Sequence, residues 1–156
     1  MATFNLYNHV AEIIGDGTLD MDNATANTFA AVFIKEDYVA LAGHTTFNDV
    51  TVANVVANAA ANAIPLPAHF WNRSTNTVNF GGDALVWTAD GGAMAGDQVV
   101  VYMQSGGGTI ETPPNTSNLL IGWSNIGAQS ISDTGTLTVK DSTNASQVVL
   151  FSHKVV

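Results

Sequence analysis

Short apolar runs separated by turn residues fill the chain from Val78 to Gly127, and this pattern limits the fold more than any other feature of the sequence. Two clear runs are Val-Val-Val-Tyr-Met at 99–103 and Leu-Leu-Ile-Gly-Trp at 119–123. The breaks between the runs are rich in glycine and proline: Gly81-Gly82, Gly91-Gly92, Gly106-Gly107-Gly108 and Pro113-Pro114. Short runs of β-branched and aromatic residues with such breaks are typical of antiparallel strands.

Further segments extend this β pattern to both sides. Residues 28–35 are apolar on both faces, which predicts a buried strand. Leu137 and Val139 alternate with polar residues, and residues 148–156 form a last candidate strand. No internal repeat or long linker divides the 156 residues, so one domain is expected over 1–156. We therefore predict a mainly β fold, an antiparallel β-sandwich whose β core covers about 28–156.

The N-terminal residues 3–15 are predicted to form an α-helix that packs on this sandwich. Four apolar residues fall on one stripe with helical spacing: Leu6, Val10, Ile13 and Ile14. Thr3 is a suitable N-cap, and Gly15 is a suitable residue to end the helix.

Residues 50–63 allow two interpretations. The first half, Val50 to Val56, has the composition of a strand, whereas the alanine-rich second half, Ala57 to Ala63, favours a helix by propensity. We expect a short helix or turn that leads into an extended segment. Pro65 and Pro67 then favour extended backbone and prevent a helix from continuing.

The charge of the chain is scarce and acidic. Four Lys and Arg residues face thirteen Asp and Glu residues, which gives a net charge of −9. Nucleic-acid binding requires clustered Lys and Arg, so we predict that the chain binds no nucleic acid and docks on no anionic membrane surface. No apolar stretch is long enough to span a bilayer, the N-terminus does not resemble a signal peptide, and the absence of Cys excludes disulfides and thiol chemistry.

Candidate reactive groups are scattered. The histidines do not have metal-ligand spacing: His9, His44, His69 and His153. Ser124 lies in a sequence like a nucleophile elbow, but the second glycine comes one residue too late. Asp16, Asp20 and Asp22 could offer oxygen ligands to Ca²⁺, although the spacing of an EF-hand is missing and solvated turn residues are favoured. We predict no catalytic residue, no metal site and no cofactor, and therefore no enzyme.

The three tryptophans could stack on a sugar or pack in the core. Trp87 and Trp123 lie in alternating apolar runs, which favours core packing. Trp71 follows a proline-rich stretch and precedes Asn72-Arg73, so it is the best candidate for an exposed ring.

Several motifs occur in a distinctive order along the chain: Phe4-Asn-Leu-Tyr-Asn-His9, Leu19-Asp-Met-Asp22, Asn76-Thr-Val-Asn-Phe80, Ala84-Leu-Val-Trp87, Val99-Val-Val-Tyr102 and Ser117-Asn-Leu-Leu-Ile-Gly-Trp123. This ordered set resembles the small virion structural proteins of tailed bacteriophages. The resemblance covers most of the chain and is most secure from Val78 to Val139. The alanine- and asparagine-rich residues 53–63 depart from the family pattern.

The resemblance implies a capsid decoration, or cement, protein that binds the outer shell and stabilises contacts between capsomers. Its partner would be the major capsid protein, and it would itself be a homo-oligomer, with a trimer as one arrangement. It would be made in the host cytoplasm and located on the capsid surface of the virion. The alternative is a tail or fibre module that binds a host surface glycan. We expect the partner contacts to come from the N-terminal segment and two loop regions: Phe4, Tyr7, His69, Trp71, Arg73, Pro113 and Pro114.

Overall fold

A computed structural model of the chain describes residues 4–19, 27–66, 70–74, 77–105, 114–140 and 147–154, with the backbone alone at 27, 70–74, 77–78, 105 and 147–154. Its elements, in chain order, are β1 (Phe4–Leu6), α1 (Val10–Gly15), β2 (Asn27–Ile34), α2 (Phe47–Val50), the 3-10 turn η1 (Val52–Asn54), β3 (Ala63–Pro65), β4 (Phe70–Ser74), β5 (Thr77–Asp83), β6 (Leu85–Thr88), β7 (Met94–Ser105), β8 (Leu119–Ile131), β9 (Thr136–Val139) and β10 (Gln147–Lys154). The fold is mainly β, as the sequence predicts.

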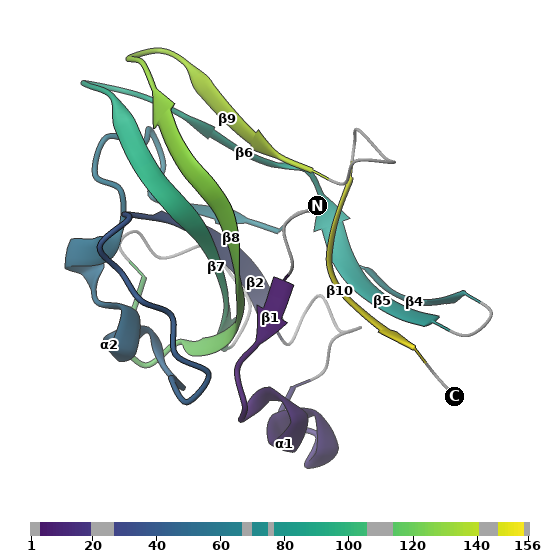
Figure 1. Cartoon of the computed structure of the whole chain (residues 1–156). Helices are drawn as coiled ribbons and strands as arrows, with labels where there is room; N and C mark the ends of the chain where they lie inside the picture. Colours follow the sequence, from purple (N-terminus) through teal and green to yellow (C-terminus); the bar gives the residue numbers. More distant parts are fainter. Residues whose placement is uncertain are drawn as a thin grey trace.

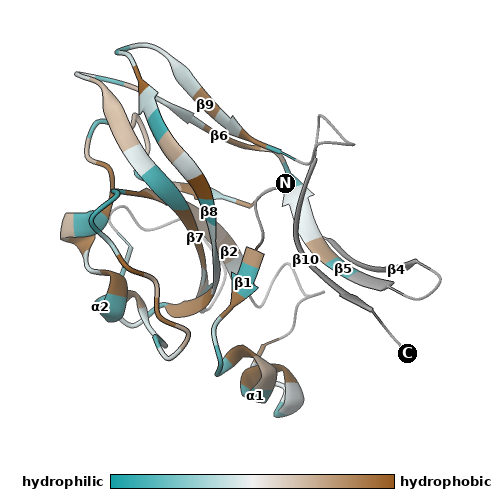
Figure 2. Ribbon diagram, viewed as in Figure 1, coloured by the Kyte–Doolittle hydropathy of each residue, from teal (hydrophilic) through white to brown (hydrophobic). Residues whose placement is uncertain are grey.

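The first layer is a five-stranded antiparallel sheet with the strand order β1-β8-β7-β2-β3. The strand predicted at 28–35 is β2, and residues 29–34 are buried on both of its faces. Residues 99–103 of β7 are likewise buried on both faces. In Figure 2 the apolar residues of β7 and β8 gather mainly in the lower half of each strand. The sheet is therefore covered on both sides, which explains why these strands are continuously apolar.

The second layer consists of two smaller antiparallel sheets, β10-β5-β4 and β6-β9. Figure 1 shows them passing alongside the first layer, with the free ends of β4, β5 and β10 directed away from it. Ring contacts join the layers, because Phe29 of β2 lies 5.0 Å from Phe80 and Phe33 lies 6.1 Å from Trp87, measured between ring centroids. This arrangement confirms the predicted β-sandwich.

The opposite face of the five-stranded sheet is covered by residues 35–56, which run from the end of β2 through α2 and η1. Phe47 of this segment is buried and meets Tyr102 of β7 edge to face, with the ring centroids 5.5 Å apart. The segment ends at Val55, which forms an isolated antiparallel bridge with Ile34. Within residues 50–63, the 3-10 turn η1 lies in the half with the composition of a strand, and the alanine-rich half forms turns and bends that lead into β3 and not a helix.

The N-terminal helix is shorter than predicted. It covers Val10–Gly15 only, because Phe4–Leu6 forms β1 and pairs with Gly122–Ser124 at the edge of β8. The half-buried Phe4 and Leu6 alternate with the exposed Asn5, and this pattern suits a strand. The edge of β8 also supplies hydrogen-bond partners for the backbone, which the amides in the first turn of a helix lack. Val10 is fully buried and holds α1 on the core, while Ile14 is 36% exposed. In the described parts of the chain, no helix has the length and apolar character needed to cross a membrane.

The tightest backbone approach in the sandwich provides a test of its packing. A Cβ atom added at Gly96 of β7 would collide with the backbone oxygen of Ile34 and lie 3.0 Å from the Phe33 ring. We predict that Gly96→Ala lowers the free energy of unfolding by about 1–3 kcal/mol, a typical cost of overpacking. Urea denaturation measures this change.

Gly43→Ala is the matched control, because Gly43 has open space around the position of the added Cβ. We expect this variant to unfold within about 0.5 kcal/mol of the parent chain, as most surface substitutions do. Equal losses for the two variants would show that β2 and β7 do not approach each other as described.

Candidate functional site

The loop of residues 38–46, which we call the Tyr38 loop, presents the most exposed large apolar side chains of the described residues. Val39 is 70% exposed and Leu41 is 55% exposed. Single apolar residues on a surface are ordinary, so the two side chains gain significance only if the backbone holds them in place. The hydrogen bonds of the loop show that it does.

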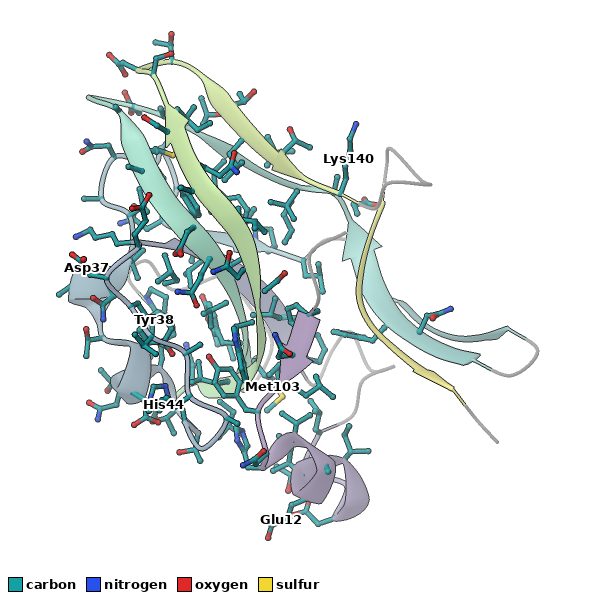
Figure 3. All side chains as sticks on the ribbon, in the orientation of Figure 1. Glu12, Asp37, Tyr38, His44, Met103 and Lys140 are labelled. Carbon is teal, nitrogen blue, oxygen red and sulfur yellow. The ribbon has the colours of Figure 1, made fainter. Side chains whose placement is uncertain are left out.

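Tyr38 anchors the start of the loop in the core. The Tyr38 backbone oxygen accepts a hydrogen bond of 2.6 Å from Nε2 of the buried Gln98 of β7. The Tyr38 hydroxyl lies 2.9 Å from Nδ1 of His44, at the other end of the loop, and 3.4 Å from the Tyr7 hydroxyl. The Tyr38 and His44 side chains lie on the same side of the molecule in Figure 3. The exposed stretch is therefore closed at its base by buried polar contacts.

The rest of the loop is fixed by the backbone and by a helix cap. The Asn8 amide donates to the Ala42 oxygen at 2.8 Å. Asp49 Oδ2 accepts from the amides of Thr45 and Thr46 at 2.8 and 3.1 Å, which completes a capping box at the start of α2. These two amide donors hold the pKa of the Asp49 carboxyl below its usual value. The loop is thus preorganised on both sides of Leu41.

A cluster of rings supports the loop from below. Tyr7 is buried, and its ring centroid lies 4.6 Å from that of Trp123. Burial, followed by the hydrogen bond with Tyr38, raises the pKa of Tyr7, and burial also raises the pKa of Tyr38. Both hydroxyls therefore keep their protons at neutral pH. They can form a chain in which Tyr7 donates to Tyr38 and Tyr38 donates to His44.

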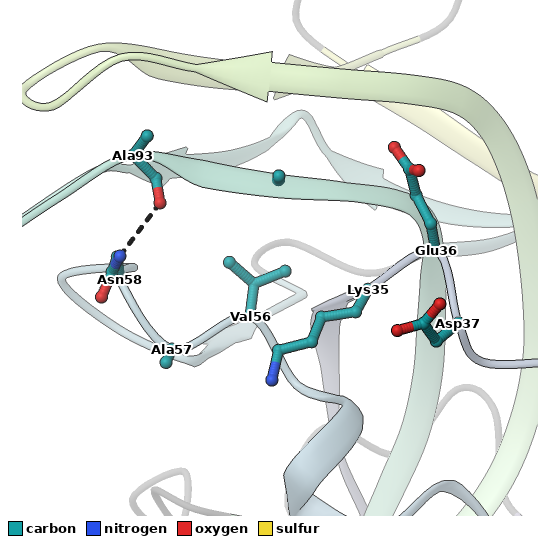
Figure 4. A pocket seen from close by; sticks show the side chains of 8 residues that line it. Lys35, Glu36, Asp37, Val56, Ala57, Asn58 and Ala93 are labelled. Atoms are coloured by element: carbon teal, nitrogen blue, oxygen red, sulfur yellow. Dashed lines mark hydrogen bonds between the residues drawn. The ribbon is translucent and has the colours of Figure 1, made fainter.

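An open pocket of about 400 Å³ lies where the end of β2 meets the start of β7 (Figure 4). It is lined by Lys35, Glu36, Asp37, Val56, Ala57, Asn58, Ala93 and Ala95. The Lys35 ammonium group donates to the Ala53 oxygen at 2.7 Å, and Asn58 Nδ2 donates to the Ala93 oxygen at 3.0 Å. These two hydrogen bonds hold residues 53–58 against the neighbouring chain, so the Lys35 and Asn58 side chains in the pocket serve the fold.

Of the seven expected contact residues, three have described side chains: Phe4, Tyr7 and Pro114. Phe4 is half-buried in β1, Tyr7 is 1% exposed, and Pro114 is buried. Trp71 and Arg73 lie in β4, where the backbone alone is described. His69 and Pro113 lie outside the described residues.

Sequence reasoning missed Val39 and Leu41. The available signal was an apolar Val-Ala-Leu stretch between the charged residues 35–37 and Gly43, too short to form a strand of the core. An apolar stretch of this kind within a predicted loop indicates an exposed contact.

The groups considered for chemistry are dispersed among the described residues. No group of three His, Asp or Glu side chains there could hold a metal ion. Ser124 is a buried residue within β8. Asp16 accepts a hydrogen bond from the Thr18 amide, which lowers the pKa of its carboxyl, while Asp20 and Asp22 lie outside the described residues.

The two tryptophans with described side chains pack on the core, as predicted. Trp87 is 1% exposed and contacts Phe33 between the layers. Trp123 is half-buried and contacts Tyr7 on the other face of the five-stranded sheet. Both rings therefore have packing partners in the core.

The hydroxyl chain beneath the loop gives a second prediction. Tyr38→Phe removes the partner of the buried Tyr7 hydroxyl and of His44 Nδ1, so we expect it to lower the free energy of unfolding by about 1–2 kcal/mol. Tyr7→Phe combined with Tyr38→Phe should cost less than the sum of the two single changes, because a hydroxyl without its partner no longer remains buried. Urea unfolding of the four proteins measures this coupling, and strictly additive losses would contradict the hydroxyl chain.

Comparison of the chain with protein-family models, with curated proteins and with solved structures finds no match.

Proposed function

We propose that the chain is a capsid decoration protein of a tailed bacteriophage, which binds the major capsid protein on the outer shell and stabilises contacts between capsomers. The observation that carries the proposal is the Tyr38 loop, where Val39 and Leu41 are exposed on a backbone fixed by buried hydrogen bonds. The ordered sequence motifs that resemble small virion proteins supply the identity of the partner.

The physics of adhesion favours such a loop. A binding surface that is already ordered loses little conformational entropy on association, so more of the free energy of apolar burial contributes to affinity. The Tyr38–Gln98 and Tyr38–His44 hydrogen bonds fix the loop before any partner arrives. About 800 Å² of buried surface on each partner is enough for a specific interface, and the loop can supply the apolar centre of such an area.

The composition of the chain suits repeated docking on a protein shell. Charged residues make up 11% of the sequence, well below the roughly 25% of an average soluble domain. An interface with few charges avoids much of the desolvation cost of burying ions. The net charge of −9 also repels nucleic acid released from damaged particles.

The glycan-binding alternative depends on an exposed aromatic ring. Trp87 is enclosed between the layers, and the half-buried Trp123 packs against Tyr7, so both rings contribute to the packing of the core. The remaining candidate is Trp71, whose side chain is outside the description. No described contact favours this alternative over adhesion through the Tyr38 loop.

A double substitution in the loop tests the proposal. We predict that Val39→Ser with Leu41→Ser weakens binding to shells of the encoding virus about tenfold or more, since fully burying a Val or Leu side chain contributes about 1.5–3 kcal/mol. The free energy of unfolding should change by less than about 0.5 kcal/mol, because both side chains are exposed. Co-sedimentation with shells prepared without the protein measures the affinity.

Val86→Ser is the matched control, because Val86 is 46% exposed but lies on β6 in the second layer. It should bind shells as the parent chain does. Unchanged shell binding by the loop variant, or an equal loss in the control, would refute the role of the Tyr38 loop.

A further inference from the structure

We propose that the N-terminal segment, residues 4–15, is an acid-released latch, in which protonation of the His9 imidazole detaches β1 and α1 from the edge of β8. This inference concerns how the segment is held, so it does not depend on what the chain binds. It rests on the surroundings of the His9 ring and on how few contacts attach the segment.

Both nitrogens of the His9 ring are shielded from solvent, which disfavours the charged form of the imidazole. Backbone groups of His44 and Leu120 lie near the ring and favour the charged form, but neither makes a hydrogen bond of good geometry with it. The ring lies beside Tyr7, with 6.4 Å between the ring centroids and an angle of 30° between the planes. A buried imidazole without hydrogen bonds already costs free energy, and a buried charge at the same place costs considerably more.

The groups that act on the pKa of His9 come from α1, α2, the Tyr38 loop and β8. Burial lowers the pKa of His9, and this effect outweighs the backbone groups of His44 and Leu120 and the carboxylates of Glu12 and Asp49, which all act to raise it. Glu12 is exposed on α1 and points away from the molecule in Figure 3. Asp49 is already engaged by the amides of Thr45 and Thr46. Neither carboxylate is therefore placed to pair closely with a protonated His9.

The segment is attached by a small number of contacts. β1 pairs with only three residues of β8, Gly122 to Ser124. Beyond β1, the Tyr7 amide donates to the Ile121 oxygen at 3.2 Å, and the Asn8 amide donates to the Ala42 oxygen at 2.8 Å. The buried side chains of Tyr7 and Val10, the contact of the Tyr7 hydroxyl with Tyr38, and the partly buried Phe4, Leu6 and Ile13 add to this attachment. A positive charge on the His9 ring would weaken these contacts. A segment attached at the edge of a sheet can open locally without unfolding the rest of the fold.

The direction of the pH dependence follows from the lowered pKa. His9 binds a proton more readily when the segment is released than when it is docked, so the docked state is fully stable above the ordinary histidine pKa of about 6.5. Docking then weakens as the pH falls below that value, by up to about tenfold in the docking equilibrium for each pH unit. Release exposes the edge groups of Gly122–Ser124, which become available to pair with another strand.

Amide hydrogen exchange at pH 7.5 and pH 5.0, corrected for intrinsic rates, tests the latch. The reporters are the amides of Tyr7 and Asn8, and the reference amides lie at 99–103 in the centre of the sheet. We expect the protection of the reporters to fall severalfold at pH 5.0, and by no more than about tenfold for each pH unit below 6.5, while the reference amides stay protected. Loss of protection in both places would indicate global unfolding and would overturn the proposal.

Three variants identify the titrating group. His9→Leu cannot be protonated and should stay docked at pH 5.0, whereas His9→Lys should be released already at pH 7.5. His44→Gln is the matched control, because its amide oxygen can still accept from the Tyr38 hydroxyl, and it should retain acid release. Acid release that persists in His9→Leu, or that disappears in His44→Gln, would overturn the assignment to His9.

Discussion

The burial of both faces of β2 and β7 is the constraint on which the rest of the structure depends. Ala30, Val32 and Ile34 face one side of the sheet, and Phe29, Ala31 and Phe33 face the other, and all six are essentially inaccessible to solvent. Two apolar faces require two covers. The smaller sheets cover the face of Phe29 and Phe33, and the segment 35–56 covers the face of Tyr102. The Tyr38 loop is thus part of the covering of the core as well as the proposed contact surface.

This double role explains why the loop combines an immobile base with an exposed tip. Its buried half must satisfy polar atoms away from water, which the Tyr38–Gln98 and Tyr38–His44 hydrogen bonds achieve. Val39 and Leu41, in the outer half of the loop, stay exposed because Phe47 and Val50 already fill the core below them. The same covering layer contacts the N-terminal segment through Tyr7 and His9, so the latch and the loop share one support.

The sequence alone predicted the strands well, because their signals are local. The strand expected at 28–35 is β2 at 27–34. Leu85 and Trp87 share the inward face of β6, and Leu137 and Val139 share the inward face of β9. Two features depend on long-range contacts and were missed. β1 was predicted as helix because its partner, β8, begins more than a hundred residues later, and the Tyr38 loop is anchored by Gln98, which is 60 residues away. No local pattern encodes such pairs.

The proposal that the sandwich covers a phage shell is tested by the copy number of the chain. Quantitative mass spectrometry of purified particles of the phage proposed to encode it gives the ratio of the chain to the major capsid protein. The account predicts a ratio close to stoichiometric, because decoration repeats at every equivalent position of the shell. A handful of copies per particle would contradict it and would place the chain in the tail or neck.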